Sequence, residues 1–323
     1  MILSIIRPVR EGSRLLSGTP LLLLIFACTG SDAGTVAHKP EQHPALSVVV
    51  TSNIVADWVR RVGGERVEVF SLSPVGGDPH TFQPGARDAA RIADADLVVS
   101  IGLDLEAAWL AELVRNAAVD ESRLAVLGEA VSPIPFAGGG EGARNGDGTM
   151  DPHFWLDPLR VELAVSAIAA RLSGTDPAAG NVYTDNAQAY GQQLRELHAW
   201  IQERVSSLPQ DRRLLATSHD SFQYFALLYG FEIVGTVIPG ATTEREPSAA
   251  ELARLVDKVK ESGAPAIFVE TTVSDRLART IAEETGARVV NALYTGSLGG
   301  PGGADTYVEM MRANVTRIVE ALE

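Results

Sequence analysis

The sequence predicts an α/β protein with two parallel-sheet lobes joined by one long rigid helix. In the N-terminal half, short continuous apolar runs alternate with segments of helical period. Residues 182–208 then form one uninterrupted helical stretch, and the alternation of strands and helices resumes after Pro209. Strands that are apolar along their whole length and separated by helices are typical of parallel sheets covered on both faces.

The first predicted lobe spans residues 46–181. Its elements are predicted from the spacing of apolar residues and from the glycines and prolines at their ends. Gly63-Gly64 ends the first helix, and Asp157-Pro158 supplies an N-cap and a first-turn proline for the last one. Residues 137–149 hold six glycines and are predicted to be a loop. The predicted strands are 46–50, 66–70, 97–101 and 123–127, and the predicted helices are 54–62, 88–92, 105–116 and 158–172.

The connecting segment, residues 182–208, has no internal proline, and its apolar residues recur at helical spacing. At 1.5 Å per residue such a helix spans roughly 40 Å, enough to run along one lobe and into the other. His198 lies in this helix and is interpreted as a flanking residue. The predicted apolar stripe is Tyr183, Ala187, Tyr190, Leu194, Leu197, Ile201 and Val205.

The second predicted lobe spans residues 209–323 and repeats the alternation. Ser248 and Glu251 form a capping box, and a glycine-rich loop at 296–303 precedes the final helix. The predicted strands are 214–217, 231–237, 266–270 and 288–290, and the predicted helices are 222–229, 248–261, 275–285 and 306–322.

The N-terminus is predicted to carry an export signal, residues 1–27, and a tether, residues 28–45. Three arginines precede the apolar run 21–27, which is too short to span a bilayer comfortably. Cys28, the only cysteine, follows as in a bacterial lipobox, which predicts lipidation and a periplasmic or cell-surface location. An ordinary cleaved signal is the alternative, because Phe26 departs from the lipobox pattern. With one cysteine, no internal disulfide can form.

The chain is strongly acidic. Its formal net charge is −14, and loss of residues 1–27 makes this about −16. Such a surface disfavours nucleic acid as a partner and raises the local concentration of cations. The composition therefore fits a cation-binding protein better than a nucleic-acid-binding one.

Three histidines stand in similar settings. The tripeptide Asp-Pro-His occurs twice, ending at His80 and at His153, and His219 follows an apolar strand. Imidazole is the commonest protein ligand for zinc, and all three lie where open α/β sheets bind ligands. Because two belong to the first lobe and one to the second, the sequence predicts a metal site in the interlobe cleft. Three unrelated surface or hydrogen-bonded histidines are the alternative interpretation.

Several further segments, in the same order along residues 46–323, carry a family resemblance. The chain resembles the bacterial zinc/manganese solute-binding lipoproteins of ABC transporters, the TroA-like metal receptors with a helical backbone. The matching segments are Gly-Gly-Asp-Pro-His-Thr-Phe-Gln-Pro (76–84), Asp-Pro-His-Phe-Trp-Leu-Asp-Pro (151–158), Ser-His-Asp-Ser-Phe-Gln-Tyr-Phe (218–225), 240–248, 267–270 and 304–311.

The resemblance implies a monomeric receptor, not an enzyme, that hands a divalent metal to membrane permease subunits. It assigns metal-ligand roles to His80, His153 and His219, and it implies that Glu270 orients a histidine. Membrane attachment is expected through a lipid anchor at Cys28.

Two departures from the family bear on the metal. Many relatives supply an aspartate where this chain has Gly296, and many zinc-specific relatives have histidines in the loop that corresponds to 137–149. The fourth position is then open or water-filled, unless a carboxylate such as Glu270 moves in. Three nitrogen ligands favour zinc, with manganese as the alternative.

Alternative functions follow from the same residues. Three histidines with an open fourth position also describe the catalytic site of an exported zinc hydrolase, with Glu270 or Asp220 as the base. A cell-surface adhesin would bind its ligand without metal. A haem or siderophore receptor is disfavoured, because an aromatic content of 6% gives little material to line a large pocket.

Overall fold

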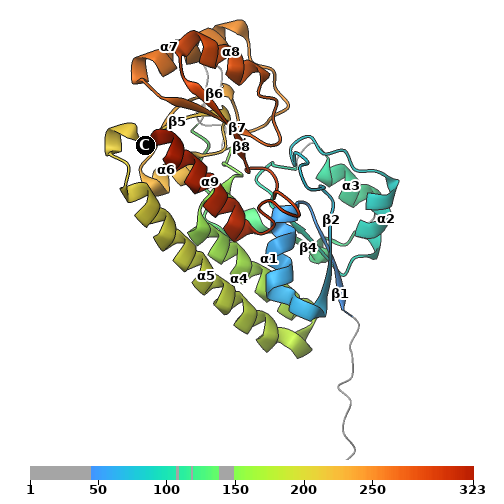
Figure 1. Ribbon diagram of the computed structural model, residues 1–323. Helices are drawn as coiled ribbons and strands as arrows, with labels where there is room; N and C mark the ends of the chain where they lie inside the picture. The colour runs from blue at the N-terminus through green and yellow to red at the C-terminus, as the bar shows by residue number, and fades with distance from the viewer. Residues whose placement is uncertain (1–44, 107–108, 118, 138–148) are drawn as a thin grey trace, which may run out of the picture. The chain divides into compact units, whose positions relative to one another are not determined.

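The computed structural model describes residues 45–106, 109–117, 119–137 and 149–323 (Figure 1). The predicted signal peptide, Cys28 and nearly all of the predicted tether lie outside the described residues, as does most of the glycine-rich loop at 137–149. Within the described part, no helix is both long and apolar enough to cross a membrane.

Two four-stranded sheets, parallel throughout, confirm the predicted fold class (Figure 1). The first has the strand order β2-β1-β3-β4 and the second the order β6-β5-β7-β8. The strands are β1 (Leu46–Val50), β2 (Val67–Ser71), β3 (Leu97–Ser100), β4 (Leu124–Val126), β5 (Leu214–His219), β6 (Glu232–Ile238), β7 (Ala266–Glu270) and β8 (Arg288–Leu293).

Helices cover both faces of each sheet, which is why the central strands carry runs of buried apolar residues. In β1, Val48 and Val50 face the main core with α1 and α5, and Val49 faces a smaller cluster with α2 and α3. In β7, Phe268 joins the main core and Ile267 packs with α7 and α8. The helices are α1 (Asn53–Gly63), α2 (Ala86–Asp94), α3 (Leu110–Asn116), α4 (Pro158–Thr175), α5 (Gly180–Ser206), α6 (Gln223–Tyr229), α7 (Ala249–Ser262), α8 (Arg276–Thr285) and α9 (Tyr307–Leu322).

Helix α5 is the predicted connecting helix, and all seven residues of its predicted stripe are buried. It packs along α4 and contacts α1 and α9 (Figure 1). The main hydrophobic core contains residues of both sheets, from Val48 on β1 to Phe268 on β7, together with the α5 stripe. The two lobes therefore share one continuous core.

The helix predicted to begin at residue 105 begins at Leu110 instead, so that prediction was wrong by one and a half turns. Gly102, Leu103 and Asp104 have φ values of +78°, +54° and +65°. Left-handed backbone cannot be part of a right-handed helix. Glu106 holds this turn, because its two carboxylate oxygens accept the N–H groups of Ile101 and Gly102, each at 2.9 Å.

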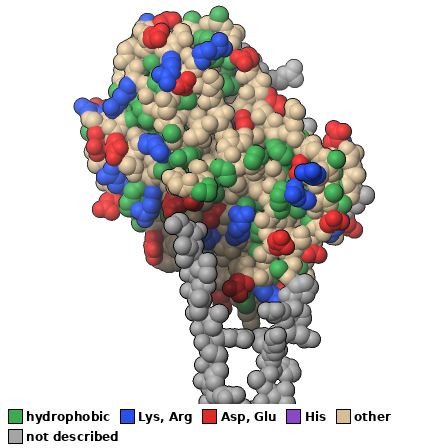
Figure 2. Space-filling model, turned by 45° about the vertical axis from the view of Figure 1, so that its right-hand side comes forward, with side chains coloured by type: hydrophobic (Ala, Val, Ile, Leu, Met, Phe, Trp, Pro, Cys, Tyr) green, Lys and Arg blue, Asp and Glu red, His purple; other side chains and the backbone are tan. Residues whose placement is uncertain are grey.

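Charge is spread over the face seen in Figure 2, where basic and acidic side chains are interspersed. The net charge of −14 is therefore not gathered into one acidic patch on that face.

Candidate metal centre

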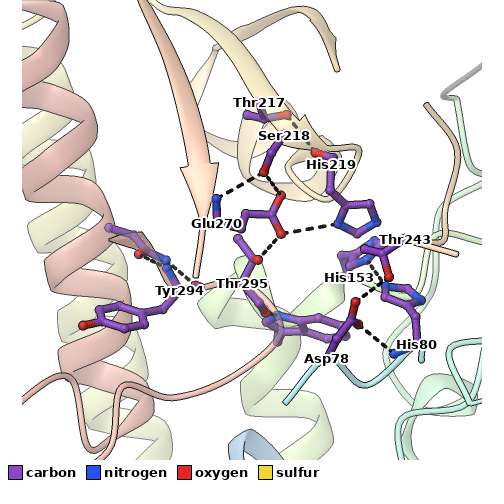
Figure 3. A network of polar contacts seen from close by, with 12 residues as sticks. Asp78, His80, His153, Thr217, Ser218, His219, Thr243, Glu270, Tyr294 and Thr295 are labelled. Carbon is purple, nitrogen blue, oxygen red and sulfur yellow. Dashed lines mark hydrogen bonds and ion pairs between the residues drawn. The ribbon is translucent and has the colours of Figure 1, made fainter. Parts of the chain in front are cut away.

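The three histidines predicted to bind metal meet in space (Figure 3). His80 lies in the loop after β2, His153 precedes a short 3₁₀ turn that leads into α4, and His219 is the last residue of β5. One ring nitrogen from each lies within 4.8 Å of the others. The Nε2 atoms of His80 and His153 are 3.3 Å apart. Residues far apart in the chain and on both lobes thus form one cluster.

The cluster is shielded from solvent. His80, His153 and His219 are 6%, 1% and 2% exposed. They line a cavity of about 10 Å³, roughly the room that one water-sized occupant needs. His219 Nε2 is buried and has no hydrogen-bond partner among the described residues. A buried polar atom without a partner is costly, so this nitrogen indicates a site built for an occupant.

A carboxylate lies behind each of two histidines. Asp151 Oδ1 is 2.8 Å from His153 Nδ1, and Glu270 Oε2 is 3.4 Å from His219 Nδ1. A carboxylate in that position keeps the proton on Nδ1 and leaves the Nε2 lone pair for a metal. In this tautomer both rings could accept a metal ion at Nε2.

Local structure fixes Glu270 at the end of β7, next to β5 in the sheet. A bulge in β8 opposite Glu270 shifts the register there, with Ala292 at a φ of +71°. Ser218 Oγ lies 3.3 Å from Glu270 Oε1, and the Thr295 hydroxyl donates to Oε2 (Figure 3). With both oxygens engaged, the carboxylate stays behind His219.

Burial sets the charge state of the site. It lowers the pKa of His80 and of His153 well below the ordinary value, and the neighbouring His219 adds to this. Burial also lowers the pKa of His219, but the charge and hydrogen bond of Glu270 outweigh it, and the net shift is upward. Burial raises the pKa of Asp151 to about 7. Burial thus favours neutral His80 and His153, the form that binds a metal, whereas Glu270 favours the protonated form of His219.

The repeated Asp-Pro-His tripeptide has a structural explanation that the sequence analysis missed. In each copy the aspartate Oδ1 accepts the backbone N–H of the histidine two residues later, at 2.9 Å for Asp78–His80 and 2.9 Å for Asp151–His153. This is the local turn that Asp side chains favour. The contact of Asp151 with the His153 ring was not predicted. The position of the aspartate two residues before the histidine was the sequence signal that could have indicated it.

Gly296 lies in the wall of the metal cavity, which agrees with the family resemblance, because many relatives have an aspartate ligand at this position. A Cβ atom there would come within 2.9 Å of Pro79 Cδ and 3.6 Å of Thr272 Cγ2. The backbone of the neighbouring Thr295 is held by the Trp155 indole, which donates to its carbonyl at 2.6 Å. The wall at Gly296 is therefore closely packed.

Residues 48–321 match the family model described as zinc-uptake complex component A, periplasmic. The chain belongs to this family. Its members are extracytoplasmic metal receptors of ABC importers and not enzymes, so the family membership confirms the predicted transport function. The hydrolase and adhesin alternatives gain no support.

The similarity to individual relatives extends over nearly the whole length of this chain. It is 33% identical over 303 residues to the manganese-binding lipoprotein MntA of Halalkalibacterium halodurans, covering 94% of this chain and 95% of that one. It is 34% identical over 307 residues to the metal ABC transporter substrate-binding lipoprotein SloC of Streptococcus mutans, covering 93% and 95%. The solved periplasmic zinc binding protein TroA from Treponema pallidum superposes with a TM-score of 0.77 at 29% identity, covering 86% and 99%.

Proposed function

We propose that this protein captures zinc outside the cytoplasm with His80, His153 and His219 and delivers it to the membrane permease of an ABC importer. The observation that carries the proposal is the cluster of three buried ring nitrogens within 4.8 Å, one of them without a partner. Glu270 orients His219 and Asp151 orients His153, and neither carboxylate replaces a histidine as ligand.

The donor set favours zinc over manganese. All three proposed ligand atoms are imidazole nitrogens, and Gly296 supplies no carboxylate. Zinc accepts nitrogen ligands in four-coordinate geometry, whereas manganese prefers oxygen ligands and a higher coordination number. The names of the relatives do not decide between zinc and manganese, since MntA is named for manganese and TroA for zinc. A water molecule then completes the coordination of zinc.

The proposal extends to the anchor and the oligomeric state. Cys28 follows an apolar run at the lipobox position, and both MntA and SloC are named lipoproteins. A monomer tethered by a lipid at Cys28, in the periplasm or at the cell surface, is the form in which we expect the protein to meet its permease. Replacing Cys28→Ser should release it from the membrane fraction, and size-exclusion chromatography should give one protomer.

Competition calorimetry tests the metal. Metal-stripped mature protein, lacking the signal and the lipid, is titrated with zinc, with manganese, and with each in the presence of the other. One tight zinc equivalent that manganese cannot displace is expected. Displacement of zinc by manganese would show that an oxygen ligand dominates, and failure to bind either would refute the transport role of the three histidines.

A further inference from the structure

The loop that carries His80 is bonded to the opposite lobe through Asp78. The Oδ1 atom of Asp78 accepts the backbone N–H of His80 at 2.9 Å. Its Oδ2 atom accepts the hydroxyl of Thr243, from the second lobe, at 2.5 Å (Figure 3). The Asp78 carboxylate thus joins the backbone of His80, a proposed metal ligand, to Thr243, which lies 165 positions after Asp78 in the chain. Both Asp78 and Thr243 line the metal cavity.

Thr243 lies on the connection between β6 and α7, residues 239–247, here called the strap. Arg245 ties the strap to its own lobe, because the guanidinium donates to the Pro239 carbonyl at 3.2 Å and to Glu251 at the start of α7. Near its first residue, Gly240 has a φ of +111°, which side-chain-bearing residues rarely adopt. The strap is therefore a defined loop that presents one hydroxyl to Asp78.

Ser297 of the second lobe accepts two hydrogen bonds from the first lobe near this loop, one of them buried. Gly76 N–H donates to Ser297 Oγ at 2.7 Å, and Asn53 Nδ2 donates to the same oxygen at 2.9 Å. Ser297 is fully buried, whereas Thr243 is only partly buried. Solvent can compete more readily for the Asp78–Thr243 bond than for the buried Asn53–Ser297 bond.

His80 is also the most exposed of the three histidines, at 6% against 1% and 2%. Within its own lobe its loop is held by the Trp109 indole, which donates to the Pro79 carbonyl at 3.1 Å. The ring closest to solvent is therefore the one whose backbone depends on Asp78.

We propose that Thr243 and Asp78 form a latch that slows metal release, with Asp78 as a positioning residue for His80. When the latch breaks, the strap separates from the loop of His80, and this histidine is the first to leave the metal. The inference rests on the proposed function, since it concerns the exit of the zinc ion held by the three histidines.

The test compares zinc dissociation from three variants of the mature protein, each loaded with one zinc equivalent and mixed with excess chelator in a stopped-flow instrument. Thr243→Val removes the hydroxyl and keeps the shape, so release should accelerate on the order of tenfold, as expected for one lost hydrogen bond to a carboxylate. Thr243→Ser retains the hydroxyl and should release zinc at nearly the wild-type rate. Thr285→Val is the matched control, because Thr285 is a partly buried threonine of the same lobe that donates to the Ile281 carbonyl and does not line the metal cavity.

An unchanged rate in Thr243→Val would overturn the latch, as would equal acceleration in Thr243→Ser or in Thr285→Val. Thermal unfolding of the metal-free variants separates the latch from a general loss of structure, since Thr243→Val should keep the wild-type Tm within a few degrees. If the wild type bound zinc but the rates were equal, only the latch would fail. If the wild type bound no zinc, the proposed function would fail with it.

Discussion

Replacing Glu270→Gln should weaken zinc binding by 10- to 100-fold, although Glu270 is not proposed as a ligand. Glu270 is 3% exposed and its Oε2 lies 3.4 Å from His219 Nδ1. Loss of such a partner behind a metal-bound histidine typically costs about 10- to 100-fold in affinity, or ~1.4–2.7 kcal/mol. The amide keeps the shape of the side chain and removes only the charge, so packing changes little.

The effect of Glu270→Gln should depend on pH in a defined direction. Glu270 raises the pKa of His219, so in the wild type a proton competes with zinc for His219 as the pH falls. In the variant the pKa of His219 is lower and this competition is weaker. The ratio of variant to wild-type Kd should therefore be larger at pH 8 than at pH 6.

Competition with a chromophoric zinc chelator at the two pH values measures both effects. Glu162→Gln serves as the matched control, because Glu162 pairs with Arg195 outside the metal cavity and should leave zinc affinity unchanged. Wild-type affinity in Glu270→Gln would refute the argument that the carboxylate acts through His219. An equal loss at both pH values would point to distortion of the site instead.

Four further outcomes are expected. His219→Ala should lower zinc affinity by at least about tenfold, measured by calorimetry, because it removes one of three ligands; wild-type binding would refute the interlobe site. Gly296→Asp should raise manganese affinity relative to zinc by about tenfold or more (~1.4 kcal/mol) in competition titrations, since it adds an oxygen ligand, and should lower Tm because its Cβ meets Pro79 Cδ at 2.9 Å. Zinc affinity of the wild type should fall as the pH drops below the raised pKa of His219, because a proton then competes with zinc for that ring while the lowered pKa values of His80 and His153 keep those rings neutral; a zinc Kd that is the same at pH 8 and pH 5 would contradict this. Leu194→Ala on α5, where the side chain is fully buried, should destabilise the protein by roughly 2–5 kcal/mol in urea unfolding without changing the metal-binding stoichiometry.

The sequence predicted the sheets well because their central strands carry runs of buried apolar residues. Leu97, Val98 and Val99 form such a run, and the stripe on α5 repeats over seven buried positions. The start of α3 was not predictable in the same way. Residues 105–116 have helical composition, and only the left-handed backbone of Leu103 and Asp104, stabilised by the distant pairing of Glu106 with Thr51, delays the helix.

The cluster of three histidines was predictable from the sequence, and the contacts that support it were not. Histidines are few, so their repeated setting stood out, and the sheet edges predicted where they would meet. The side chains that support the histidines belong to residue types with many possible roles, which the sequence alone does not distinguish. Thr295 and Ser218 reach Glu270, and Thr243 reaches Asp78, only because strands and loops far apart in the chain become neighbours after folding.

The hydrophobic core shared by the two lobes limits how this receptor can open to release its metal. Because one hydrophobic core runs through both lobes and along α5, a wide opening about a hinge would expose residues such as Leu194 and Phe268, which are fully buried. Exposing apolar surface costs about 25 cal/mol per Å². Separating Thr243 from Asp78 breaks one partly exposed hydrogen bond and leaves that core intact. Opening of the proposed latch therefore costs less than separation of the lobes, because it does not expose that core, and the carboxylates behind His153 and His219 stay in place.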